Sequence, residues 1–139
     1  MEGEECMYRK VLIPLDGSDA DETILDHMMG LAKIHGSEVH LIRVIHSHTR
    51  DALRHETEVA TRYLEASVAR FRDLGIQAEW IIEYGEPENV ITEKAKEISA
   101  DLIAMATHGH GWLIDILFGS VAHKVRHTVS IPVLMIRRN

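Results

Sequence analysis

Short apolar runs alternate with longer amphipathic segments along the whole chain, and this order restricts the fold more than any other feature. The first run, KVLIPLD at residues 10–16, is almost entirely apolar, which is typical of a strand buried on both faces of a sheet. The next segment repeats apolar residues at a spacing near 3.6 and stops at Gly36, as an amphipathic helix does. The pattern continues to the last run, PVLMIR at 132–137.

Five strands and four helices are expected in strict alternation. The expected strands are 10–16, 38–45, 78–85, 101–107 and 132–137. The first expected helix starts at a capping box formed by Ser18 or Asp19 with Asp21 or Glu22. The second runs over 51–74, the third starts at Pro87, and the fourth runs over 119–127. Such alternation predicts a single-domain, doubly wound α/β fold. Its five-stranded parallel sheet has the order 3-2-1-4-5 and carries helices on both faces.

Composition excludes several classes of protein. The 139 residues fit one domain over 1–139, in which we expect 1–8 to be a flexible tail, and the hydrophobic (45%) and charged (27%) fractions are those of a globular chain. No apolar window approaches the roughly 18 residues that span a bilayer, and the acidic start is unlike a signal peptide. We therefore expect a cytoplasmic protein without a membrane partner. The net charge of −7 would repel nucleic acid, and the single cysteine, Cys6, leaves no intrachain disulfide.

A ligand site is expected where the strand order reverses, beyond the carboxyl ends of the first and fourth strands. The two loops that leave these strands, 14–18 and 107–118, are rich in Gly, Pro and Asp. Glycines and the helix start at Gly119–Ser120 would offer backbone N–H groups to an anion, and Asp16 would bind a ribose diol or a phosphate-bound Mg²⁺. These features predict a nucleotide. The alternative is that the glycines only form turns and Asp16 only caps the first helix.

Four segments resemble the universal stress protein family from Arg9 to Arg138: KVLIPLDGS, EVHLIRVI, ADLIAMATHG and LFGSVAHKVRHTVSIPVLMIRR. The ATP-binding members of that family carry the motif Gly-x2-Gly-x9-Gly-Ser/Thr. Gly109, Gly119 and Ser120 match its last three positions, and Ala106 replaces its first glycine. A positive φ at Ala106 would cost on the order of 1 kcal/mol, whereas a β conformation would leave its N–H usable.

This resemblance implies that ATP or a related adenine nucleotide is the ligand, with Mg²⁺ as a possible companion bound by Asp16. It implies that the adenosine part of the nucleotide lies near Pro14 and Asp16 and that Val44 and Met105 contact the base. The glycine loop would then contact the phosphates. The nucleotide-binding residues expected in this way are Pro14, Leu15, Asp16, Val44, Met105, Ala106, His108, Gly109, His110, Gly119, Ser120 and Val121.

Other chemistry is poorly supported by the sequence. A P-loop lysine and an arginine finger are missing from the motifs, so we expect at most slow ATP hydrolysis and no catalytic residue. His123 and His127 have the spacing of a zinc-binding pair without a third ligand, and His46 and His48 are expected in solvent. The predicted edge strand carries a contiguous apolar run, Val133, Leu134, Met135 and Ile136, which predicts a homodimer; the resemblance implies the same.

Three functions remain open at this point. The first is a regulatory module of the stress response that binds ATP and is read by an unidentified protein partner. The second is a dimeric scaffold that has lost nucleotide binding, with the replacement at Ala106 as the first sign. The third is a slow ATPase or a transferase that acts on a bound nucleotide.

Overall fold

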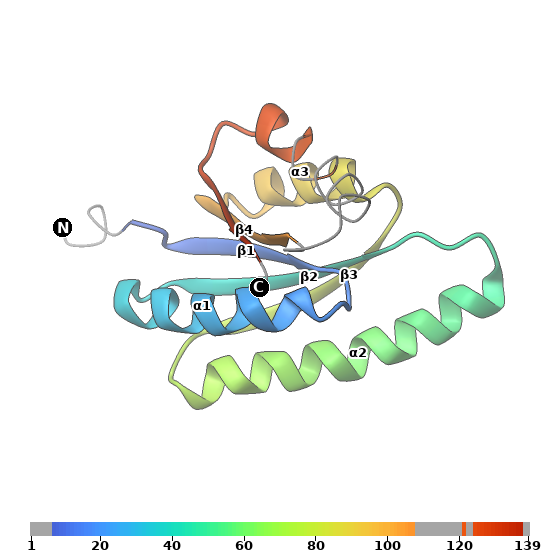
Figure 1. Ribbon diagram of the computed structural model, residues 1–139, viewed down its shortest axis with the longest axis horizontal. Coiled ribbons are helices and arrows are strands. Elements are labelled where there is room, and N and C mark those ends of the chain that lie inside the picture. The colour runs from blue at the N-terminus through green and yellow to red at the C-terminus, as the bar shows by residue number, and fades with distance from the viewer. Residues whose placement is uncertain (1–6, 108–120, 122–123, 138–139) are drawn as a thin grey trace.

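The described residues form a five-stranded parallel sheet with helices on both faces, shown in Figure 1, a computed structural model. The structure describes residues 7–107, 121 and 124–137. The strand order is β3-β2-β1-β4-β5, which confirms the predicted order. The strands are β1 (Lys10–Leu15), β2 (Glu38–Ile45), β3 (Ala78–Tyr84), β4 (Leu102–Thr107) and β5 (Val133–Arg137). The helices are α1 (Ala20–His35), α2 (Arg50–Asp73) and α3 (Pro87–Glu97), and residues 124–128 are also helical.

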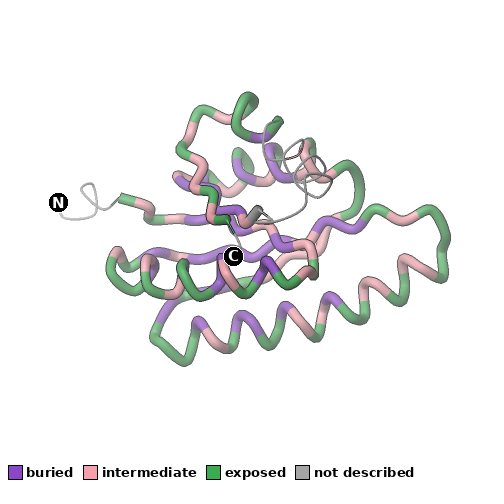
Figure 2. The backbone as a smooth tube through the Cα atoms, in the orientation of Figure 1, coloured by how far each residue is buried: buried purple, intermediate pink, exposed green. Residues whose placement is uncertain are grey.

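The two hydrophobic cores lie on opposite faces of the sheet. Val11, Ile13 and Leu15 of β1 pack with the buried stripes of α1 and α2, while Leu12 belongs to the core beneath α3. Figure 1 shows α1 and α2 on one face and α3 on the other, and in Figure 2 most of β1 and β2 is buried between them. Burial on both faces explains why these strands are uninterrupted apolar runs rather than alternating ones.

The pairing of β1 sets the position of an opening in the sheet. β1 pairs with β2 from Lys10 to Leu15, but its pairing with β4 covers only Val11↔Leu102 and Leu12↔Ile103. β4 then continues beside β5 as far as Thr107. The carboxyl ends of β1 and β4 therefore separate, which is the place where a doubly wound sheet binds its ligands.

The start of α1 differs from the capping box expected from the sequence. Asp19 is the N-cap residue and makes no side-chain cap bond, while Ser18 Oγ accepts the Ala20 N–H at 3.3 Å. Asp21 does not cap the helix, because its carboxylate turns back toward the end of β1. The predicted helix was correct, and Asp19 is one of the two predicted N-cap residues, but the side-chain hydrogen bonds of a capping box are not formed.

The remaining helix ends follow local rules. Gly36 ends α1 with φ of 67°, and Thr49 Oγ1 caps α2 by accepting the Ala52 N–H at 3.1 Å. α2 begins and ends one residue earlier than expected, and Pro87 occupies the first turn of α3 as predicted. In the described part of the chain, no helix combines the length and the apolar character needed to cross a bilayer.

Candidate functional site

A pocket of about 340 Å³ lies where β1 and β4 separate. This volume is within the range of small-molecule sites, roughly 300–1,000 Å³. Residues from the ends of β1, β2 and β4 and from the starts of α1 and α3 meet around it. The lining residues are Pro14, Leu15, Asp16, Ala20, Asp21, Ile42, Arg43, Val44, His46, Glu56, Pro87, Ile91, Met105, Ala106 and Val121.

The pocket has an apolar wall and a charged edge. Ile42, Val44, Ile91 and Met105 also belong to the core beneath α3, so this wall is part of the packed interior. The charged lining residues are Asp16, Asp21, Arg43, His46 and Glu56. An apolar wall beside a few polar groups suits a flat, mostly apolar ring that carries hydrogen-bonding substituents.

The turn after β1 places Asp16 at the charged edge. Gly17 has φ of 83°, a left-handed conformation that favours glycine, and Asp16 Oδ1 accepts the Ser18 N–H at 2.9 Å. Among the described residues, Asp16 Oδ2 has no protein hydrogen-bond donor.

Asp21 is a buried carboxylate directly beside this turn. It accepts the Asp16 N–H at 3.2 Å, the Gly17 N–H at 2.8 Å and the Tyr63 hydroxyl at 2.7 Å. Burial raises the pKa of the Asp21 carboxyl to about 6, an effect that the Tyr63 hydrogen bond opposes and the Asp16 charge reinforces. Burial and the neighbouring Asp21 carboxylate raise the pKa of the Tyr63 hydroxyl above its usual range.

Arg43 brings a cation to the pocket from the end of β2. Its Nη1 donates to the carbonyl oxygen of Val44 at 2.8 Å. Its Nε lies 3.8 Å from the position that a side-chain carbon on Gly17 would take, so the guanidinium packs against the turn. Arg43 therefore lies close to the turn after β1 while it binds the carbonyl oxygen of Val44.

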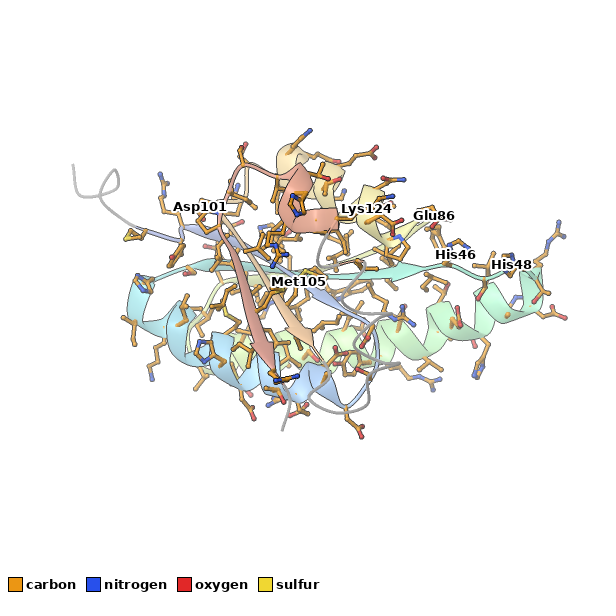
Figure 3. The ribbon with its side chains drawn as sticks, turned by 45° about the horizontal axis from the view of Figure 1, so that its top comes forward. His46, His48, Glu86, Asp101, Met105 and Lys124 are labelled. Carbon is orange, nitrogen blue, oxygen red and sulfur yellow. The ribbon has the colours of Figure 1, made fainter. Side chains whose placement is uncertain are left out.

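His46 was expected in solvent, and the structure confirms that it is exposed. Its side chain is 39% exposed, but it lines the pocket and its Nδ1 lies 3.4 Å from Glu86 Oε2. Figure 3 shows the two side chains near each other, from the connections that follow β2 and β3, with His48 further along. The rings of His46 and His48 also pack edge to face, with their centroids 5.4 Å apart.

Ala106 adopts the conformation that leaves its N–H usable. It lies within β4 opposite Ile136 of β5, and its φ is not positive. The replacement of the first motif glycine therefore introduces no backbone strain.

The structure brings together seven of the twelve residues expected at the site, all of them lining this pocket: Pro14, Leu15, Asp16, Val44, Met105, Ala106 and Val121. The other five, His108, Gly109, His110, Gly119 and Ser120, lie outside the described residues, as does His123, one of the two histidines with zinc-binding spacing. The residues described in the structure contain no group of three His, Cys, Asp or Glu that could hold a metal ion. Mg²⁺ at Asp16 would therefore take most of its other ligands from phosphate oxygens and water.

Sequence reasoning missed several lining residues. Asp21 was interpreted as a helix cap, and its actual partner Tyr63 is 42 residues away, so no local pattern indicated the pair. Arg43 did have a signal, since it is a charged residue inside the apolar run of β2. Glu56 is held near the pocket by Ser47, whose hydroxyl donates to Glu56 Oε1 at 2.6 Å.

The parallel sheet and its strand order define a doubly wound α/β protein with a pocket at the point where the strand order reverses. The family model of the universal stress proteins matches residues 7–137, and the chain belongs to this family. It is 31% identical over 148 residues to universal stress protein YxiE of Bacillus subtilis, covering 94% of this chain and 100% of the relative.

Solved structures show the same fold. That of MJ0577 from Methanocaldococcus jannaschii superposes with a TM-score of 0.81 at 30% identity, covering 96% of this chain and 98% of the other. A universal stress protein from Archaeoglobus fulgidus, solved in complex with dAMP, superposes with a TM-score of 0.72 at 24% identity, covering 94% and 98%. Another universal stress protein, solved in complex with cAMP, has a TM-score of 0.76 at 21% identity, covering 94% and 98%.

Proposed function

We propose that the chain is a cytoplasmic regulatory module of a stress response that binds ATP or a related adenine nucleotide in the pocket between β1 and β4. The observation that carries this proposal is the pocket itself. It lies at the switch point, and an apolar wall from β2, β4 and α3 faces the acidic turn after β1. Family membership and the fold shared with the dAMP-bound and cAMP-bound proteins support the same ligand class.

Different parts of the pocket would contact the base, the ribose and the phosphates of the nucleotide. Met105 and Ile42 would pack against the base, and the backbone of Val44 would meet its edge. Asp16 would accept hydrogen bonds from the ribose hydroxyls through Oδ2. The phosphates would then extend toward Val121 and the glycine loop, where His108, Gly109, His110, Gly119 and Ser120 are proposed to hold them together with Mg²⁺.

In this proposal the module does little chemistry. ATP binding would change the surface of the protein, which a partner protein would then recognise. The partner is also expected to meet a homodimer formed through the exposed edge of β5.

Isothermal titration with ATP, ADP, AMP, cAMP and GTP, with and without Mg²⁺, tests the ligand. We expect adenine nucleotides to bind and Asp16→Ala to weaken them by about tenfold. Asp26→Ala is the matched control, because Asp26 is an exposed carboxylate on α1 that pairs with Arg70. Absence of heat and of a thermal shift at millimolar nucleotide would favour the scaffold function instead. Phosphate release that Asp16→Ala abolishes would favour the slow ATPase.

A further inference from the structure

The Asp21 carboxylate lies beneath the turn that follows β1, in the first turn of α1. Only 3% of the residue is exposed. Its two oxygens bind two successive backbone N–H groups: Oδ1 accepts the Asp16 N–H at 3.2 Å, and Oδ2 accepts the Gly17 N–H at 2.8 Å. These N–H groups belong to the segment that presents the Asp16 side chain to the pocket.

A second helix fixes the Asp21 carboxylate from the other side. The Tyr63 hydroxyl of α2 donates to Asp21 Oδ2 at 2.7 Å. The adjacent Leu64 is fully buried, which anchors this part of α2 against the sheet. The carboxylate is therefore held between α1 and α2 and has little freedom to follow a displaced turn.

The turn depends on this acceptor. Gly17 has a left-handed conformation, and Asp16 uses one carboxylate oxygen to accept the Ser18 N–H at 2.9 Å. Without Asp21, two partly buried N–H groups would lose their acceptor, and the turn would rearrange to satisfy them elsewhere. Such a rearrangement would also redirect Asp16 Oδ2, the oxygen that the proposed function assigns to the ribose hydroxyls.

We propose that Asp21 is a positioning residue of the pocket: held by Tyr63, its carboxylate fixes the Asp16–Gly17 turn and thereby aims the Asp16 carboxylate at the ribose hydroxyls of the bound nucleotide. The nucleotide in this inference rests on the proposed function. The order of the turn does not, and it is measurable without a ligand.

Three variants test the arrangement in the full chain. Asp21→Asn keeps the shape but replaces one acceptor oxygen by a donor, and Tyr63→Phe removes only the supporting hydroxyl. Asp26→Asn is the matched control on the exposed face of α1. Amide hydrogen exchange followed by NMR, without ligand, should accelerate by about tenfold at Asp16 and Gly17 in Asp21→Asn, less in Tyr63→Phe, and not at all in Asp26→Asn. If Asp21→Asn does not fold, the amide exchange of Tyr63→Phe is compared with that of Asp26→Asn.

A double-mutant cycle then separates positioning from a general loss of structure. Asp21→Asn should weaken AMP binding three- to tenfold in the wild-type background, and by less than about twofold in the Asp16→Ala background, because both changes remove the same contact. Unchanged exchange at Asp16 and Gly17 would overturn the inference, as would equal losses of affinity in both backgrounds. Failure of the wild-type chain to bind AMP, ATP or cAMP would overturn the proposed function alone, while the amide exchange would still decide whether Asp21 orders the turn.

Discussion

The hydroxyl of Tyr63 lies 2.7 Å from Oδ2 of Asp21, and this hydrogen bond joins two helices at the edge of the pocket. Tyr63 belongs to α2, while Asp21 belongs to α1 and accepts two backbone N–H groups from the turn after β1. The position of the turn is thus tied to a helix that contributes only Glu56 to the pocket lining.

We expect the Asp21 carboxyl to make stability decrease as the pH rises from about 4 to about 6. Burial raises its pKa from 3.8 to about 6, so the folded chain holds this proton more tightly than the unfolded chain. The contribution is complete below pH 3.8 and is lost as the pH rises through about 6, a change of about 3 kcal/mol. Urea unfolding across this range should show wild type losing stability relative to Asp21→Asn. A difference between the two that is independent of pH would contradict the prediction.

Ala106→Gly should leave nucleotide affinity within about twofold while it lowers stability by about 0.5–1 kcal/mol. The reason is that Ala106 lies in an ordinary strand conformation, where glycine gains no contact and costs backbone entropy. Titration with ATP and thermal unfolding measure the two effects. Ala104→Gly, in the same strand, is the control for the loss of stability alone. A gain in affinity of tenfold or more would mean that the alanine impairs the site.

Met135→Lys should convert the proposed homodimer into a monomer. β5 is an edge strand, and Met135 is 38% exposed there, so a charge would disrupt the pairing of two such edges. Light scattering at micromolar concentration measures the mass of each variant. Ile34→Lys is the matched control, since Ile34 is an apolar residue of α1 with 82% exposure. A wild-type chain that remains monomeric would refute the proposed dimer.

Asp101→Ala should lower the free energy of unfolding by about 1–3 kcal/mol without changing the pocket. Its carboxylate accepts the Arg9 N–H at 2.8 Å and the Lys10 N–H at 3.0 Å, and both bonds are charge-assisted. Asp101 directly precedes β4, while Met105 lies further along that strand and lines the pocket (Figure 3), so nucleotide affinity should stay the same. Asp73→Ala, at an exposed residue that ends α2, should have little effect on denaturant unfolding.

The fold was predictable because its elements are encoded locally. The apolar run of β1 and the glycine after α1 are signals that act within a few residues, and the alternation of strands and helices predicts a parallel sheet. The order of the strands was an assumption, which the structure confirms. The capping of α1 was mispredicted because Asp21 satisfies the preceding turn instead of its own helix. A competing long-range partner, Tyr63, gave that carboxylate a different role.

The pocket was predictable only where it coincides with strand ends. Pro14, Asp16, Met105 and Ala106 line it because parallel strands bring their carboxyl ends to one edge. Arg43 and Glu56 were missed, since their orientation depends on Val44 and Ser47 and not on a repeated pattern. Whether these residues bind a nucleotide stays a prediction, to be decided by the titrations described above.

The short pairing between β1 and β4 has a practical consequence for experiments on living cells. The two strands are joined near Val11 and Leu12 and are open at their other ends, so the amino-terminal side of β1 points away from the pocket. A fluorescent reporter fused ahead of Arg9 would therefore leave the entrance clear. An environment-sensitive dye that reports whether the pocket is occupied belongs at the pocket itself, for example at His46.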